Sequence, residues 1–230
     1  MDMLSEGLSG ALRLLLGFDP DFTAIVAVSV LVAFTSTSLA ALTAVPVGVL
    51  IAQRRFPGRG GVIAVLNTLM SLPTVVVGLL VYSMLSRNGL FGSLGLLYTR
   101  TAMVIGQWIL AFPIVAALTV ATMEGLDTRV HSTAISLGAS PMQAFLRLLS
   151  EARFGIVAAV VAGFGRVFAE VGVSMMLGGN IKTYTRSITT AIALETNRGE
   201  FALGLALGIV LLTVALLVNI LLALLKRRTP

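Results

Sequence analysis

The chain has 230 residues, of which 57% are hydrophobic and 11% charged, and it contains no cysteine. Soluble domains carry about a quarter of charged residues, so this composition indicates an integral membrane protein. The absence of cysteine excludes disulfides and thiolate metal sites, and a lone histidine disfavours a histidine-based metal or proton-relay site. The net charge of +6 does not indicate a nucleic-acid partner, because the basic residues lie at the ends of apolar segments.

The first predicted element, over residues 1–21, is an amphipathic helix at the membrane surface. Leucines recur there at helical spacing with polar residues between them. A short additional membrane span over residues 1–18 is the alternative. A cleavable signal peptide is not predicted, because the segment carries Asp2 and Glu6 and lacks a basic start.

Five downstream segments are long and apolar enough to cross a membrane, which takes about 20 residues of helix. Lipid permits only helices or closed barrels, and continuous apolar runs exclude the alternating pattern of a barrel. The sequence therefore predicts an all-α integral membrane protein with its membrane domain over residues 22–230. The predicted spans are residues 22–51, 62–85, 101–123, 154–177 and 201–225.

Three of these spans contain a proline, at Pro46, Pro73 and Pro113. Proline removes a backbone hydrogen bond and kinks a helix, and neighbouring helices in a membrane bundle satisfy the freed carbonyl. Two interpretations stay open: irregular packing, or flexible and broken helices that line a pathway.

The polar segment over residues 124–153 separates the third and fourth spans and carries helix signals of its own. Asp127 or Thr128 is suited to begin a helix. Gly138 is suited to end that helix, and Pro141 to begin the next one. We expect two short helices joined by a sharp bend, a shape that suits docking into a groove on another protein.

Lysine and arginine predict the orientation of the chain. The set of span ends that is richer in these residues faces the cytoplasm. We therefore expect the N-terminus outside, the C-terminus in the cytoplasm, and the 124–153 segment inside. The richer set is Arg54, Arg55, Arg59, Arg129, Arg147, Arg153, Lys226, Arg227 and Arg228, and the poorer set is Arg13, Arg87, Arg100, Lys182, Arg186 and Arg198.

The 124–153 segment contains the run Ala134-Ile-Ser-Leu-Gly-Ala-Ser140. This run is similar to the A-x-x-L-G-A-S core of the permease subunits of bacterial ABC importers. Of that family's longer signature, Ala134 and Gly138 match and Leu148 replaces an isoleucine, whereas the glutamate and the proline are absent. The resemblance covers about residues 22–225 and implies a type I (MetI-like) helical bundle with five core spans, coupled to a separate ATPase. It assigns the coupling contact to Ala134, Leu137, Gly138, Ala139, Ser140, Pro141 and Phe145.

A narrower resemblance follows, in the runs Gly163-Phe-Gly-Arg-Val-Phe-Ala-Glu-Val-Gly172 and Glu195-Thr-Asn-Arg-Gly-Glu-Phe201. These runs are similar to tungstate permeases, relatives of the molybdate and sulfate permeases, and all three anions stay open as substrates. The resemblance implies a homodimeric pore in the inner (plasma) membrane. It also implies two copies of an ATPase that carry ATP and magnesium, no cofactor in this chain, and a periplasmic or lipoprotein oxyanion-binding protein.

Arg166 and Glu170 lie four residues apart inside the fourth predicted span, and are therefore expected on one helix face. A charge inside the membrane costs about 2.5–3.5 kcal/mol on insertion scales, and pairing offsets part of that cost. One interpretation is a structural ion pair. The other is a gate, in which Arg166 attracts an anion and Glu170 prevents its permanent capture.

A polar stretch after this span supplies hydroxyl, amide and cationic donors, which suit a divalent tetrahedral oxyanion. An ordinary polar loop and a docking surface for the binding protein are the alternatives. The phosphate-loop pattern G-x4-G-K-[ST] occurs nowhere in the chain, so we expect no ATP site in it. The candidate donors are Asn180, Lys182, Thr185, Arg186, Thr189 and Thr190.

We therefore predict a transport subunit that supplies a path and a coupling element and has no enzymatic activity. A stand-alone secondary transporter is a second hypothesis, although we find no clear internal repeat and only Glu170 lies deep in a span. A membrane-embedded enzyme is a third, and the sequence offers no convincing cluster of His, Asp and Glu for it.

Overall fold

The computed structural model describes residue 17 and residues 20–227, and within this part of the chain the regular elements are all helical. The predicted all-α class is therefore confirmed. The amphipathic helix predicted over residues 1–21 lies almost entirely outside the described residues. Among the described residues, three helices are long and apolar enough to cross a membrane, or five if each of two bent pairs counts as one span.

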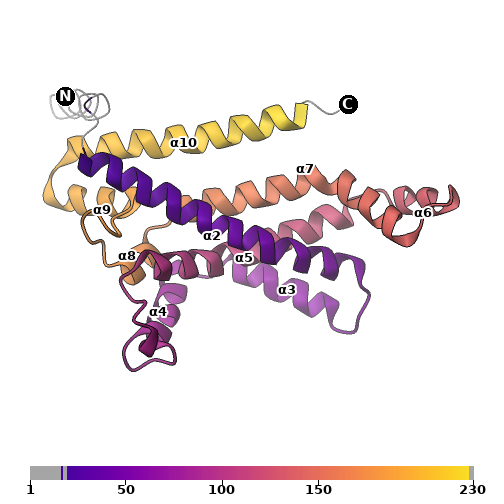
Figure 1. The fold of residues 1–230 in the computed structure, drawn as a ribbon, viewed down its shortest axis with the longest axis horizontal. Coiled ribbons are helices and arrows are strands. Elements are labelled where there is room, and N and C mark those ends of the chain that lie inside the picture. The colour runs from indigo at the N-terminus through magenta and orange to yellow at the C-terminus, as the bar shows by residue number, and fades with distance from the viewer. Residues whose placement is uncertain (1–16, 18–19, 228–230) are drawn as a thin grey trace.

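The centre of the molecule is formed by helix α2, Pro20–Gln53, packed along helix α5, Arg100–Glu124 (Figure 1). The two backbones come close at Gly48, where a Cβ atom would lie 2.8 Å from the carbonyl oxygen of Ala116. Close approach of this kind depends on small residues at the helix interface. Glycine at this position therefore sets the distance between the two central helices.

The second predicted span is two helices, α3 (Arg59–Met70) and α4 (Thr74–Leu85), which are bent by 97° relative to each other. The predicted span over residues 62–85 is therefore broken at Pro73, and broken helices are one of the two interpretations left open for the prolines. Proline disfavours helical backbone in the residue before it, and the chain leaves the helix before Pro73 and begins α4 directly after it.

The fourth predicted span begins earlier and ends earlier than expected. Helix α7, Pro141–Phe168, runs without interruption from the polar segment into the membrane domain, so the second short helix of that segment is its first turns. Only the first short helix, α6 (Thr128–Ser136), is separate. After α7 the chain breaks and continues as helix α8, Gly172–Gly178, at an angle of 62°.

The remaining elements are a short 3-10 helix, η1 (Gly92–Leu94), helix α9 (Ile188–Arg198) and helix α10 (Phe201–Arg227). Helix α9 forms within the polar stretch after the fourth span. Helix α10 packs against α9 and α7, along one side of the bundle (Figure 1).

The long helices lie side by side, so several connecting segments lie at two opposite ends, whereas α4 and the loop after it project to one side (Figure 1). We call the end with α6 and residues 54–58 the α6 end, and the end with α9 and residues 179–187 the α9 end. Arg54, Arg55 and Arg129 lie at the α6 end, whereas Arg100 and Arg186 lie at the α9 end. The structure therefore divides these residues between the ends as the predicted topology requires.

Candidate translocation and coupling sites

Helix α6, residues 137–140 and the first two turns of α7 form a bent unit, here called the elbow, which projects from the bundle (Figure 1). Helix α6 begins where the Asp127 side chain accepts a hydrogen bond from the Arg129 backbone. Gly138 has a φ of +88°, a backbone conformation that favours glycine. Ser140 and Gln143 then form a reciprocal capping box that begins α7. The predicted sharp bend is thus present.

The predicted coupling residues occupy different positions on the elbow. Leu137, Gly138, Ser140 and Pro141 are exposed, and the Leu137 side chain is 82% exposed. Phe145 instead packs inward, against the cluster of buried side chains that holds α2, α5 and α7 together at this end. Large exposed apolar groups on a projecting segment indicate a protein contact. Ala134 and Ala139 are half-buried.

Behind the elbow lies a cavity of about 740 Å³, whose lining includes Arg55, Arg59, Glu124 and Phe145. The Arg59 Nε donates to the carbonyl oxygen of Ile51 at 2.8 Å, and its Nη2 forms an ion pair with Glu124. The last turns of α2 and α5 are therefore tied together by one guanidinium at the base of the elbow.

Arg166 and Glu170 form an ion pair, with Nη1 and Oε2 2.8 Å apart. They do not share one helix face, because α7 ends at Phe168 and Glu170 lies in the break before α8. The second carboxylate oxygen of Glu170 accepts a hydrogen bond from the Val173 backbone at 3.1 Å, which caps α8. The Glu170 side chain is 3% exposed and that of Arg166 is 38% exposed. Both carboxylate oxygens of Glu170 are therefore bonded within the protein, whereas part of the Arg166 side chain is exposed to solvent.

Three hydroxyls predicted as anion donors are buried and bonded within the chain. Thr185 donates to the Gly178 carbonyl and accepts from the Ile181 backbone. Thr189 donates to the Glu170 carbonyl at 2.7 Å, and Thr190 forms a capping box with Ser187 that begins α9. Thr189 thus connects the α7–α8 break to α9, whereas Thr185 closes the loop after α8 and Thr190 caps α9, so all three hydroxyls donate within the chain.

The other predicted donors differ from these hydroxyls. The Asn180 Nδ2 donates to the Thr190 carbonyl at 3.5 Å, and its Oδ1 is buried with no hydrogen-bond partner among the described residues. Lys182 and Arg186 line a charged cavity together with Asp21, Glu195 and Arg198.

An arginine and a tyrosine pair secure the loops of the α9 end. The Arg100 Nε donates to the Tyr184 carbonyl at 2.6 Å, and its guanidinium stacks over the Tyr184 ring. The Tyr98 and Tyr82 hydroxyls are 3.2 Å apart. This hydrogen bond raises the pKa of the Tyr98 hydroxyl above its ordinary value.

Three polar side chains form a hydrogen-bonded line inside the membrane domain, and two of them, Gln107 and Ser174, are not among the residues that the sequence indicated. Gln107 on α5 accepts from the Ser36 hydroxyl at 3.2 Å, and its Nε2 donates to the Ser174 hydroxyl at 3.1 Å. All three residues are buried. These two hydrogen bonds therefore join α2, α5 and α8. The sequence signal for these bonds is Gln107, the single amide in an otherwise apolar span. Polar groups at membrane depth bond one another inside the protein, so such an amide indicates a polar partner on a neighbouring helix.

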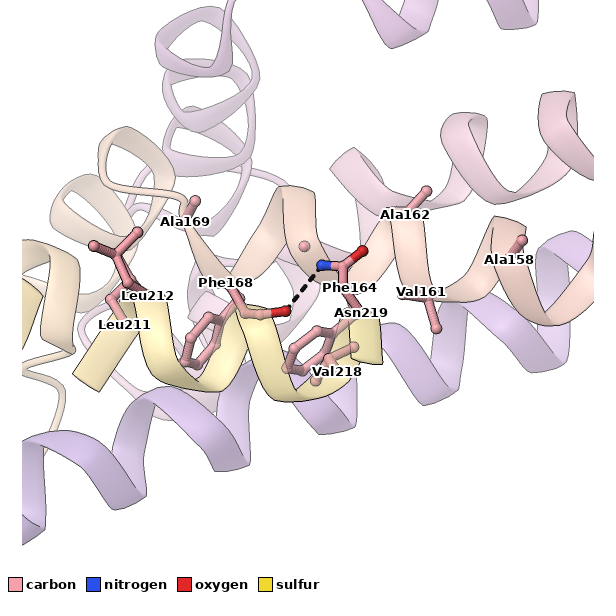
Figure 2. Close-up of a pocket in the computed structure, with 12 residues that line it drawn as sticks. Ala158, Val161, Ala162, Phe164, Phe168, Ala169, Leu211, Leu212, Val218 and Asn219 are labelled. Carbon is pink, nitrogen blue, oxygen red and sulfur yellow. Dashed lines mark hydrogen bonds between the residues drawn. The ribbon is translucent and has the colours of Figure 1, made fainter. Parts of the chain in front are cut away.

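The cavity between α7 and α10 has a different character. It encloses about 400 Å³ and is lined mainly by small and apolar side chains, with Phe164 and Phe168 on α7 facing α10 (Figure 2). The Asn219 Nδ2 donates to the Ala215 carbonyl of its own helix at 2.9 Å. An apolar lining does not compensate an anion for its lost hydration, so we exclude this cavity as a charged-substrate site.

The helices are long enough to cross a membrane, and two of the spans are broken. An apolar elbow projects at one end of the bundle, and basic residues lie at both ends. These features together indicate a multi-pass membrane transport subunit. The comparisons with known proteins specify this class. Residues 44–229 match the family described as "Binding-protein-dependent transport system inner membrane component", and the chain belongs to this family.

Curated relatives and a solved structure agree with this membership. The chain is 38% identical over 219 residues to the tungstate uptake system permease protein TupB of Peptoclostridium acidaminophilum, covering 95% of this chain and 96% of the relative. It is 28% identical over 196 residues to the molybdenum transport system permease protein ModB of Escherichia coli, covering 79% and 83%. An inward-facing MetNI methionine ABC transporter structure matches with a TM-score of 0.70 at 19% identity, covering 90% and 94%. The predicted MetI-like ABC importer permease fold is therefore confirmed.

Proposed function

We propose that this chain is the membrane-spanning permease subunit of an ATP-driven importer for a tetrahedral oxyanion, and that this anion is tungstate. The observation that carries the proposal is the full-length similarity to a tungstate uptake permease, which is closer than the similarity to the molybdenum permease. Molybdate and sulfate are the competing substrates, because all three anions present four oxygens in tetrahedral geometry.

The proposed assembly contains two copies of this chain, two copies of a separate ATPase that carry ATP and magnesium, and a periplasmic oxyanion-binding protein. The family description supports the binding protein. The exposed apolar face of the elbow supports a protein partner at the α6 end. The α6 end would then face the cytoplasm, with the C-terminus inside and the N-terminus outside. The chain itself carries no cofactor and contacts lipid but no nucleic acid.

The proposed mechanism has no chemical step in this chain. The binding protein delivers the anion at the α9 end, into a path between the two copies. Closure of the ATPase dimer moves the elbow, and α7 carries this motion without interruption to the break that holds Glu170. The two broken helix pairs are the positions at which the path reorients. A ligand shifts such an equilibrium only by its differential affinity for the two states.

The test is reconstitution of this chain with its ATPase and binding protein in vesicles. We expect ATP-dependent tungstate uptake that unlabelled molybdate and sulfate inhibit less well than unlabelled tungstate. Equal inhibition by molybdate or sulfate would reassign the substrate. Uptake by the purified chain alone, without ATPase, would contradict the importer and indicate a secondary transporter.

A further inference from the structure

A small charged cavity opens at the α9 end, where the start of α2, the loop after α8, α9 and the start of α10 meet. It encloses about 280 Å³, and a water molecule takes up about 30 Å³ of liquid volume, so a four-oxygen anion fits inside. The charged residues that line it are Asp21, Lys182, Arg186, Glu195 and Arg198.

The charges in this cavity do not cancel. Lys182 Nζ lies 2.6 Å from Asp21 Oδ2, which forms a matched pair. A single carboxylate oxygen of Glu195 is shared by Arg186 Nη1 at 3.6 Å and Arg198 Nη1 at 3.4 Å. Three cations therefore face two carboxylates, and the excess charge lies on the two guanidinium groups.

Arg186 is the distinctive member of this set. Its side chain is only 14% exposed, and its Nε is buried with no hydrogen-bond partner among the described residues. Its 3.6 Å separation from Glu195 exceeds the usual N–H···O distance of about 2.7–3.2 Å. Leaving a buried charged donor unsatisfied is costly, and an oxygen-rich anion in the cavity would remove that cost.

Arg198 and Lys182 are the more exposed cations of the cavity. Both side chains are more than half exposed, so they can reorient toward a ligand. Arginine binds the oxygens of an anion in a planar, bidentate geometry, and lysine adds a mobile point charge. Buried Glu195 keeps the two guanidinium groups together and limits the net charge.

We propose that this cavity is a binding site for a tetrahedral oxyanion, with Arg186 as the anchor and Arg198 and Lys182 as the exposed arms. The identification of that anion as transported tungstate rests on the proposed function. The same chemistry accommodates the phosphate of a lipid headgroup. As a substrate site, the cavity concentrates the anion beside the path before translocation, as clefts with one excess sign of charge do.

The experiment measures equilibrium binding of radiolabelled tungstate to the assembled transporter in phosphatidylcholine nanodiscs, without binding protein or nucleotide. We expect saturable binding that weakens with salt. Arg198→Gln and Lys182→Gln should each weaken it at least about ten-fold, because each removes a charge-assisted hydrogen bond to the anion. Arg186→Gln should weaken it at least as much. Arg87→Gln is the matched control, because it removes one exposed arginine from the loop after α4 and lies outside the cavity.

A second set of nanodiscs, containing phosphatidylglycerol, distinguishes the two sources of the oxyanion. A lipid headgroup in the cavity would displace tungstate there and appear as bound lipid by native mass spectrometry, in amounts that fall in Arg186→Gln and not in Arg87→Gln. Tungstate binding unaffected by phosphatidylglycerol identifies the free anion.

The proposal is overturned if neither tungstate nor phosphatidylglycerol binds, or if the cavity variants bind like Arg87→Gln. Uptake assays on the same preparation separate this outcome from failure of the proposed function. Normal tungstate uptake without binding in the cavity would contradict the proposed site and support the importer. Binding in the cavity without uptake of any oxyanion would support the site and contradict the importer.

Discussion

The two ends of this bundle use their side chains in opposite ways. At the α6 end, the elbow exposes leucines and methionine to solvent while its polar groups cap its own helices. At the α9 end, buried threonine hydroxyls bond backbone groups across α8, α9 and the loop between them. The first pattern leaves an apolar surface that requires a partner, and the second stabilises the chain internally. Substitutions matched inside and outside the elbow therefore test whether the elbow is a docking element.

The largest effect on ATPase binding and uptake is expected from a substitution at Gly138. Gly138→Val forces a β-branched residue into left-handed backbone, at a cost of about 1–2 kcal/mol, and thereby reshapes the elbow. No atom lies within 4 Å of the added Cβ, so the bundle itself is not disturbed. We expect loss of ATPase co-purification and at least a ten-fold fall in uptake.

Gly58→Val is the control for this change. Gly58 has a φ of +86° and the same open surroundings, but it lies between α2 and α3 outside the elbow. The strain is therefore the same, and the ATPase should stay bound. Equal loss of the ATPase in both variants would show that backbone strain, and not the elbow surface, causes the defect.

The next effect is expected at Leu137. Leu137→Glu places a charge on the most exposed apolar side chain of the elbow, and removal of a central interface contact costs at least about tenfold in affinity. Leu90→Glu is matched to it, because Leu90 is 83% exposed and Leu137 is 82% exposed. In a pull-down titration with the ATPase, Leu137→Glu should bind weakly and Leu90→Glu like the wild type. The docking assignment fails if the two variants cannot be told apart.

A smaller effect on stability is expected at the α7–α8 break. Glu170→Ala removes the cap of α8 and leaves Arg166 unpaired, which should cost about 1–3 kcal/mol because charged hydrogen bonds are lost. Arg166→Ala should cost a similar amount, because it leaves the buried Glu170 carboxylate with only its hydrogen bond from the Val173 backbone. Thermal unfolding of both single variants and the double variant measures the coupling.

Uptake by the Arg166→Ala variant distinguishes the two interpretations of this ion pair. A gate predicts a loss of uptake that is larger than the loss of stability explains. A structural pair predicts that uptake falls only as far as stability does. Full substrate-stimulated ATPase activity and full uptake would contradict the gate.

Sequence patterns predicted the helices better than the breaks between them. The length of each apolar run was sufficient to locate α2, α5 and α10, because hydrophobicity is a local property of the chain. The effect of proline was not local. Pro113 lies buried in the middle of α5, where packing supports the helix, whereas the chain breaks at Pro73. The break at Glu170 depends on the long-range bond from Thr189, which no local pattern encodes.

The candidate site was predictable to the same limited degree. A run resembling a known family located the elbow, including the bend at Gly138. The hydroxyl donors could be recognised by residue type, but their orientation depends on tertiary packing. Thr185 and Thr190 bond within the fold, whereas the Arg186 Nε has no hydrogen-bond partner among the described residues. Only the three-dimensional arrangement distinguishes a structural polar group from one that is available to a ligand.

The smallest effect is expected at Gln107, where Gln107→Leu removes two interhelical bonds and keeps the side-chain size. Side-chain hydrogen bonds inside membrane proteins average about 0.6 kcal/mol, so a loss of about 1 kcal/mol is expected. Asn219→Leu is the matched control, because the Asn219 amide bonds only the Ala215 carbonyl of its own helix among the described residues. Its unfolding midpoint should stay close to that of the wild type. If Gln107→Leu is equally neutral, then the hydrogen bonds of Gln107 do not hold α8 to the central helices.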